Sequence, residues 1–481
     1  MAPRTPTLNK QGLVALGAER LAGLVLDEAE RNGPFKKLAM AALASARGPE
    51  AVAAIVDKRL AGLERAGGRI GWERAKSFAD DLWATLKIIT GDLAKGDADA
   101  AADRLMRFLA TADRTLARMS ESASAAEVYH AAAQALPALI AEYPREESAS
   151  LADRLYQLTA GSSAYAVRDS LPAILSQAGA GVVDAFDQRL VDAVGALGPV
   201  AADDTDWSRR ARVNRLIALR QRVADARGDV DAFIALETAL PKRFQDGAEV
   251  AERLIGAGRA REALDWVRRP ARAAVRRLSI ADLAAGLAPR DPAADRRARL
   301  EIRALEALGE RAKARALRWA VFEETIDAAA LREHLAHLPD FEDVDALDKA
   351  FAHALATPLK YAALRFLVEW PRLDLAERLA VARRGEWDGR SYEILAPAAE
   401  ALASAHPLGA TILYRALIDS ILARGQSLAY PHAARYYAAL EALAPHEDPG
   451  WPIDPPGAYR AELRRRHGRK FGFWSLVDTA G

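Results

Sequence analysis

Short glycine-containing turns recur between stretches of helical periodicity along this chain. They are Gly96-Asp97, Gly228-Asp229, Gly258-Arg259 and Gly309-Glu310. A glycine that directly follows a helix takes the left-handed conformation at little cost, and the next helix then begins within a few residues. The four turns therefore predict antiparallel helical hairpins.

The stretches between the turns carry apolar residues at helical spacing. Pro49 begins one stretch and Gly67-Gly68 ends it, in agreement with the preference for proline in the first helical turn and for glycine just past the last. Its predicted buried face consists of Val52, Ile55, Val56, Leu60 and Leu63. Residues 72–93 repeat the pattern as one predicted helix, whose buried face consists of Trp72, Phe78, Leu82, Leu86 and Ile89.

Composition favours helix along all 481 residues. Hydrophobic residues make up 51% of the chain and charged residues 28%, which is typical of a folded protein. Alanine, leucine, arginine and glutamate are abundant, and all four have high helix propensity. We therefore predict an all-α fold of stacked antiparallel helical hairpins, an α-solenoid without strands. Its hairpins resemble degenerate tetratricopeptide-type repeats, because residues 263–266 are similar to residues 316–319.

Proline and glycine clusters predict breaks within this array. Three parts result: an N-terminal helical array at 1–200, central helical-hairpin repeats at 201–385, and a C-terminal helical module at 386–481. The central part is basic in its first section. The last part contains a proline-rich segment at 445–457, which we expect to lie over the surface as a rigid strap, and a basic tail.

Several classes of function are excluded or made improbable by what the sequence lacks. The chain has no cysteine, which excludes disulfides, thiolate zinc sites and iron–sulfur clusters. Its start is polar and without the apolar core of a secretion signal, and no stretch reaches the ~20 apolar residues of a membrane span. We therefore expect a cytoplasmic protein that does not bind membranes.

No motif in the sequence encodes chemistry. The only histidine cluster is Glu333-His334-Leu335-Ala336-His337, in which two histidines three residues apart could ligate a metal together with a carboxylate. The spacing of metalloproteases is absent, so we interpret the cluster as a solvated helix end. Phosphate-binding glycine loops, dinucleotide fingerprints and nucleophile elbows are also missing. The sequence predicts neither a cofactor nor an enzyme.

Tryptophans fall into two groups by their neighbours. Trp83, Trp266, Trp319 and Trp370 lie among apolar residues at helical spacing and are expected in the core. Trp451 and Trp474 are flanked by proline, glycine and phenylalanine near the end of the chain. This second group could supply exposed anchors for a partner.

Two basic clusters are the candidate binding sites for a partner or a polyanion. The first consists of Arg268, Arg269, Arg272, Arg276 and Arg277, and the second of Arg464, Arg465, Arg466, Arg469 and Lys470. Such clusters attract phosphates or acidic partners. Arginine also covers helix surfaces with its long aliphatic stem and is favourable near helix C-termini, so a purely structural role stays open.

The two ends of the chain resemble known families. Residues 430–436, 459–463 and 467–470, with Phe473-Trp474, are similar to the end of bacterial SWIM-type zinc-finger proteins. The start, with Leu8-Asn9, Leu13, Leu16-Gly17 and Arg20-Leu21, resembles an uncharacterised bacterial all-helical family of unknown function that shares this C-terminus. The finger needs cysteine, which is absent here. The resemblance thus implies a helical fold and a bacterial cytoplasmic setting, and it supplies no catalytic residue.

A non-enzymatic scaffold is the function that these features favour. Stacked hairpins form an extended groove suited to a protein or peptide partner. The alternative is a nucleic-acid-binding helical-repeat protein that contacts phosphates through its clustered arginines. An enzyme whose site is assembled by distant helices ranks third.

Overall fold

The computed structural model describes residues 8–141, 143, 148–160, 165–198, 206–269, 292–339, 341–444, 448 and 450–479. Every regular element in these ranges is a helix, and a single isolated bridge joins Ile70 to Met119. The prediction of an all-α chain is thus confirmed. Within the same ranges, no helix is both long enough and apolar enough to cross a membrane.

Contacts between Cα atoms divide the chain into two compact units, Met1–Gln245 and Asp246–Gly481. Each unit contains its own hydrophobic cluster of buried residues. The division into three parts at 200 and 385 stays a prediction.

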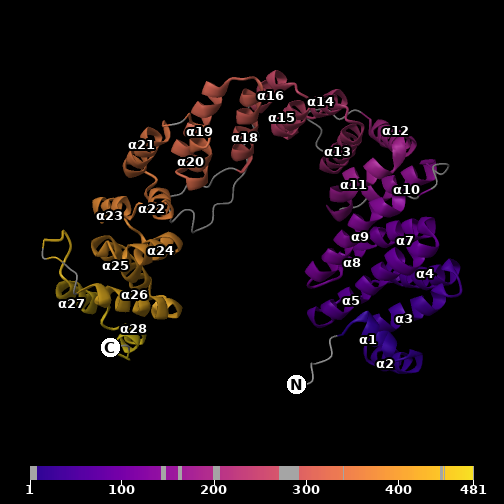
Figure 1. Ribbon diagram of the computed structural model, residues 1–481, viewed down its shortest axis with the longest axis horizontal. Helices are drawn as coiled ribbons and strands as arrows, with labels where there is room; N and C mark the ends of the chain where they lie inside the picture. The colour runs from indigo at the N-terminus through magenta and orange to yellow at the C-terminus, as the bar shows by residue number, and fades with distance from the viewer. Residues whose placement is uncertain are drawn as a thin grey trace. The chain divides into compact units, whose positions relative to one another are not determined.

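The first unit is built from α-helices joined by short turns (Figure 1). Its elements are α1 (Lys10–Ala15), α2 (Ala18–Arg31), α3 (Gly33–Ser45), α4 (Pro49–Arg65), α5 (Trp72–Ile88), the π-helical turn η1 (Ile89–Leu93), α6 (Ala94–Gly96), α7 (Ala98–Ala110), α8 (Ala112–Ala117), α9 (Ala123–Ala141), α10 (Ser148–Ala160), α11 (Tyr165–Gln177), α12 (Gly179–Leu197), α13 (Trp207–Arg227), α14 (Val230–Ala239) and the 3-10 turn η3 (Lys242–Phe244).

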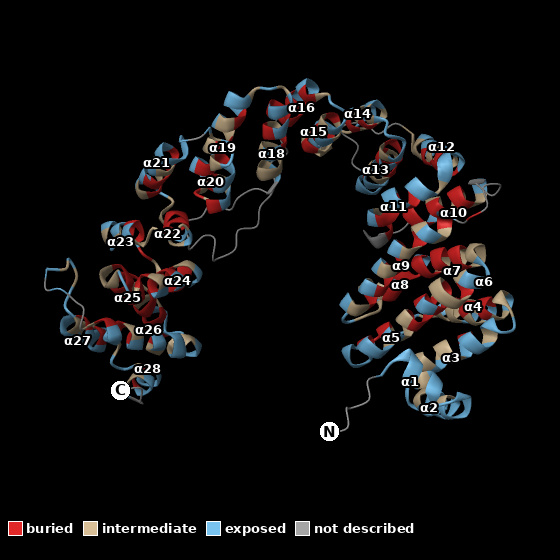
Figure 2. Cartoon of the chain, in the orientation of Figure 1, coloured by how far each residue is buried: buried red, intermediate tan, exposed pale blue. Residues whose placement is uncertain are grey.

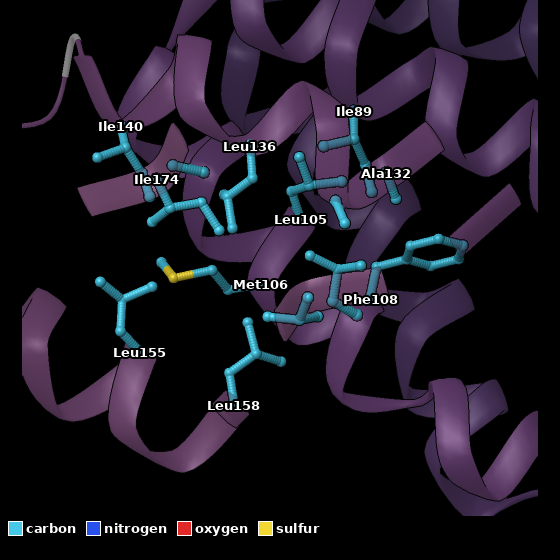
Figure 3. Packing of buried hydrophobic residues seen from close by; sticks show 14 of the residues in the cluster. Ile89, Leu105, Met106, Phe108, Ala132, Leu136, Ile140, Leu155, Leu158 and Ile174 are labelled. Carbon is cyan, nitrogen blue, oxygen red and sulfur yellow. The ribbon is translucent and has the colours of Figure 1, made fainter. Parts of the chain in front are cut away.

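The core of this unit forms where helices pack on their neighbours and on the helix after next. α9 packs on α5, α7 and α11, and α12 packs on α10 and α13. Leu105, Met106 and Phe108 of α7 meet Leu136 of α9 and Leu155 of α10 in this core (Figure 3). By contrast, α1 and α2 contain no buried residue. Their exposed surface is visible in Figure 2.

The second unit continues with helices of eight to eighteen residues. Its elements are α15 (Gly247–Gly256), α16 (Ala260–Val267), α18 (Pro292–Ala307), α19 (Arg311–Thr325), α20 (Ala328–Leu335), α21 (Asp343–Ala356), α22 (Lys360–Glu369), α23 (Leu373–Ala382), the 3-10 turn η4 (Gly389–Ser391), α24 (Tyr392–Leu402), α25 (Pro407–Arg424), the 3-10 turn η5 (Ser427–Ala429), α26 (Tyr430–Leu443), α27 (Pro456–His467) and α28 (Phe471–Thr479).

Helix α25 occupies the centre of the last part of this unit. α23, α24, α26, α27 and η4 all pack against it. Accordingly α25 has buried residues on every side, among them Leu413, Leu417 and Ile421. A helix that is apolar all round is expected to be surrounded by other elements.

Three of the four predicted glycine turns have the expected conformation. Gly228, Gly258 and Gly309 have φ angles of 66°, 75° and 72°, in the left-handed region. The prediction is wrong for Gly96, whose φ is not positive. A Cβ at Gly96 would lie 3.0 Å from the Pro49 Cβ, so this glycine allows α6 to approach the start of α4 closely.

The predicted helix over residues 72–93 is divided, because α5 ends at Ile88 and the π-helical turn η1 follows. Trp72 is 74% exposed, so its assignment to the buried face is wrong. It is the first residue of α5, where a neighbouring helix need not cover it. Trp474 is 4% exposed, so the expectation of an exposed anchor there is also wrong.

The four tryptophans expected in the core do pack there. Trp266 is buried, and Trp83, Trp319 and Trp370 lie half-buried against the two hydrophobic clusters. The apolar neighbours at helical spacing were therefore a sound indicator of burial for these residues.

The 3-10 turn η4 lies directly on α25. A Cβ added at Gly389 would be 2.4 Å from the Ala416 carbonyl oxygen and 2.8 Å from the Leu417 Cα. Both of these atoms belong to the backbone of α25, which cannot move aside to relieve a clash as a flexible side chain could. Only glycine therefore permits this spacing between η4 and α25.

We expect Gly389→Ala to lower the free energy of unfolding by about 1–3 kcal/mol, as overpacking does in other cores. Gly457→Ala is the matched control, because no atom lies within 4 Å of its added Cβ. Urea denaturation of both variants tests the prediction. Equal stability of the two variants would contradict the close approach at Gly389.

Candidate functional site

The first basic cluster is described only in part. Arg268 donates from Nε to Glu301 Oε1 at 2.7 Å, and the guanidinium of Arg269 lies 3.4 Å from the centroid of the Trp266 ring. Both cations therefore have partners within the fold. The other members of this cluster lie outside the described residues: Arg272, Arg276 and Arg277.

The second basic cluster begins at the end of α27. The Arg464 guanidinium donates to Asp478 of α28 at 3.1 Å and lies 4.1 Å from the centroid of the Trp474 ring. The other contacts that bury Trp474 are with the rings of Tyr437 and Phe473. Arg465 and Arg466 both pair with Glu462, at 2.7 and 2.9 Å. Three of the five cations in this cluster therefore have a carboxylate partner, and two of the three share one carboxylate.

The remaining two cations, Arg469 and Lys470, precede α28. Within the described ranges neither makes an ion pair. The Lys470 Nζ would lie 3.4 Å from a Cβ added at Gly425, which caps the C-terminus of α25. A cation is favourable at this end of a helix because the helix dipole is negative there.

Next to Gly425 the surface opens into a groove of about 990 Å³. Helices α24 and α26 form its two sides, and both pack on α25. The C-terminal end of α25 and the turn η5 also line it. We call it the α24–α26 groove, and its lining residues are Gly389, Tyr392, Glu393, Ala396, Pro397, Glu400, Ile421, Arg424, Gly425, Gln426, Ser427, Leu428, Ala429, His432, Arg435 and Tyr436.

The floor of the groove is apolar. Ala396, Ile421 and Tyr436 line it and are buried. At the rim, Tyr392 is 55% exposed and Leu428 is 96% exposed. Large apolar side chains with this much exposure beside an apolar floor are typical of an interaction site.

Charged side chains line both walls of the groove. Glu393 and Glu400 lie on α24, and Arg435 lies on α26 with its guanidinium 5.4 Å from the centroid of its neighbour's ring, that of Tyr436. In the described part of the chain none of these three residues makes an ion pair. The groove therefore carries charges that the protein's own contacts leave unbalanced.

The hydroxyl of buried Tyr414, on α25, is close enough to charged residues of both walls to be affected by them. Burial raises its pKa, and the Glu400 carboxylate and the neighbouring Tyr436 raise the pKa further. Arg435 acts in the opposite direction and lowers it. The acidic and basic walls thus influence the same buried group from the two sides of α25.

The histidine cluster is not a solvated helix end throughout. His334 is 5% exposed, whereas the His337 side chain is 45% exposed. The His334 ring lies 5.3 Å from that of Trp319, and burial lowers its pKa. No group of three or more potential metal ligands occurs in the residues that the structure describes.

Sequence reasoning did not identify the α24–α26 groove. Its residues come from five separate elements (η4, α24, α25, η5 and α26), and Glu393 and Glu400 are not distinguishable from other solvent-facing carboxylates. One signal was present: Leu428 follows directly after Gly425-Gln426-Ser427, a turn in which an apolar residue has no helix face to occupy.

Comparison with known proteins gives one match. No curated protein and no solved structure matches the chain. A protein-family model matches residues 3–476, and the family is described as one of unknown function, DUF6880. Because the match covers nearly the whole sequence, the chain belongs to DUF6880, a family of unknown function.

Proposed function

We propose that this protein is a non-enzymatic scaffold of the cytoplasm and that its α24–α26 groove binds a helical segment of a protein partner. The observation that carries the proposal is the combination of an apolar floor, two exposed apolar side chains at the rim, and charges on both walls that make no ion pair within the described residues. This combination is typical of surfaces that desolvate a partner's apolar side chains and orient it by charge.

A helix suits the groove better than an extended peptide. An extended peptide binds tightly by adding a strand to a sheet edge, and the described part of the chain contains no strand. A helix satisfies its own backbone hydrogen bonds and can lay an apolar stripe between two supporting helices. Its diameter of about 10–12 Å is that of the α-helices that form the walls.

The proposal extends to the architecture. We propose that the helical hairpins form an α-solenoid of degenerate tetratricopeptide-type units. The left-handed glycines at Gly228, Gly258 and Gly309 support this arrangement, as does the packing of helices on the helix after next in the first unit. The bacterial origin and the similarity of the C-terminus to SWIM-type proteins stay predictions.

Nucleic-acid binding is the weaker alternative. Phosphate contacts need cations that are free to exchange counterions. Arg268 pairs with Glu301, Arg464 with Asp478, and Arg465 with Glu462. These ion pairs lower the positive charge that either cluster can offer a phosphate backbone.

We expect the double variant Tyr392→Ala/Leu428→Asp to bind helical peptides at least about tenfold more weakly, because it removes both rim contacts and places a charge beside the apolar floor. The peptides are selected from a displayed library of helices panned against the whole wild-type chain. Fluorescence anisotropy then measures their affinity for both proteins.

Leu43→Asp is the matched control for this experiment. Leu43 is 73% exposed on α3, so the same change there should leave both peptide affinity and melting temperature unaltered. If the library yields no binder, or if its binders tolerate the double variant, the groove is not a peptide site.

For the alternative, we expect duplex DNA to bind only weakly at ~150 mM salt, in the range of non-specific contacts. A titration of generic duplex DNA at several salt concentrations measures this. A tight complex whose affinity falls steeply with salt, and falls again in Arg464→Gln/Arg465→Gln, would favour the nucleic-acid function instead.

A further inference from the structure

The walls of the α24–α26 groove carry opposite charges. Glu393 and Glu400 are seven residues apart on α24 and both line the groove, so they lie on one helix face two turns, or about 10.5 Å, apart. Arg435 and His432 line the groove from α26, and Arg424 lines it from the end of α25. One wall is therefore acidic, and the other wall and the lining at the end of α25 are basic or neutral.

These charges are held apart by the floor. Glu400 and Arg435 both influence Tyr414 on α25, yet they form no ion pair with each other. The Arg424 Nε donates to the backbone oxygen of Ser420 at 3.1 Å, and within the described residues Arg424 makes no ion pair. The pKa of the Asp388 carboxyl is lowered mainly by Arg390 and to a smaller degree by the charge of Arg424. Across its width the groove therefore carries opposite charges that only water and mobile ions compensate when no partner is bound.

We infer that the occupant is an amphipathic helix with two oppositely charged edges, an inference that rests on the proposed peptide-binding function. One edge carries lysine or arginine residues seven positions apart, which match Glu393 and Glu400. The other edge carries carboxylates, which match Arg435. A stripe of leucine-like residues between the edges covers the floor at Ile421 and Tyr436.

A uniformly charged helix or a nucleic acid would place its charges against charges of the same sign on at least one wall of the groove. A uniformly acidic helix places carboxylates against Glu393 and Glu400, and a uniformly basic helix places cations against Arg435 and Arg424. A nucleic acid brings phosphates to the acidic wall. Juxtaposed like charges suppress the wrong partners, so the two-sided pattern provides specificity.

The opposite walls also fix the direction of the bound helix. If the bound helix is turned end for end on the floor, its apolar stripe still contacts the floor. Its two edges, however, now face the opposite walls. A two-edged helix therefore matches the walls in one chain direction only. A helix with identical edges has no such preference.

The experiment uses three helical peptides with the same leucine stripe. One has lysines seven residues apart on one edge and glutamates seven residues apart on the other, one has lysines on both edges, and one has glutamates on both edges. Their affinities for the whole chain are measured by fluorescence anisotropy. Each exposed ion pair contributes about 0.2–1 kcal/mol, so we expect the two-edged peptide to bind about three- to tenfold more tightly than either uniform peptide.

Charge reversal of the acidic wall sharpens the test. In Glu393→Lys/Glu400→Lys both walls are basic, so the peptide with glutamates on both edges should become the tightest binder. Glu127→Lys/Glu324→Lys is the matched control, because both glutamates are exposed on helices that do not line the groove. This variant should keep the wild-type order. The preference should shrink at high salt, where exposed charges are screened.

Two outcomes separate this inference from the proposed function. If the three peptides bind wild-type protein with equal affinity, and Tyr392→Ala/Leu428→Asp still weakens them, the groove binds helices but the inferred charge pattern is wrong. If none of the three binds and library selection also fails, the proposed function itself is wrong. An unchanged order of affinities in Glu393→Lys/Glu400→Lys would likewise overturn the inferred pattern.

Discussion

The close packing of five elements around α25 is the constraint on which the C-terminal part of the structure depends. α25 is buried on all sides, so the helices that cover it must share its surface. η4 reaches it only because Gly389 has no side chain. With α24 and α26 both resting on the same helix, a channel floored by α25 stays open between them. The groove is thus a consequence of the packing and requires no special sequence motif.

The same helix also holds the end of the chain through buried polar contacts. Arg415, only 8% exposed, donates to the Asp454 carbonyl oxygen at 2.7 Å and lies 4.5 Å from the centroid of the Tyr459 ring. The Tyr459 hydroxyl donates to Asp419 at 3.1 Å. This hydrogen bond is partly buried, and burial also raises the pKa of the Asp419 carboxyl. A hydrogen bond in such a partly dehydrated environment is stronger than in water. α27 is thereby fixed to α25, and its arginines are positioned for their pairs with Glu462 and Asp478.

Local features of the structure could be predicted from the sequence, and contacts between distant residues could not. The left-handed glycine at Gly228 follows from local backbone energetics alone. At Gly96 the same reasoning failed, because a contact with Pro49, forty-seven residues earlier, determines the role of that glycine. The pairing of Arg268 with Glu301 joins two helices whose register no periodicity specifies. For the same reason the groove, which five elements assemble, could not be located in advance.

The basic clusters on arginine-rich helices were the strongest functional signal in the sequence. In the structure, many of the arginines pair with carboxylates of the same fold. Ion pairs between different helices recur along the chain: Arg107 of α7 with Glu64 of α4, Arg227 of α13 with Asp187 of α12, and Arg296 of α18 with Glu249 of α15. Each exposed pair stabilises little by itself, but a mispaired register would set like charges together, so the pairs favour one stacking of the helices.

An unpaired charge that lines a groove is more informative than a dense cluster whose members pair within the fold. Glu393, Glu400 and Arg435 are scattered in sequence and would draw no attention in a search for charge runs. They nevertheless gather at one groove with an apolar floor, and within the described residues they lack ion-pair partners. Charges that a fold leaves uncompensated on facing walls are available to a ligand at no cost in broken ion pairs. The groove therefore gives a stronger argument for partner binding than either basic cluster does.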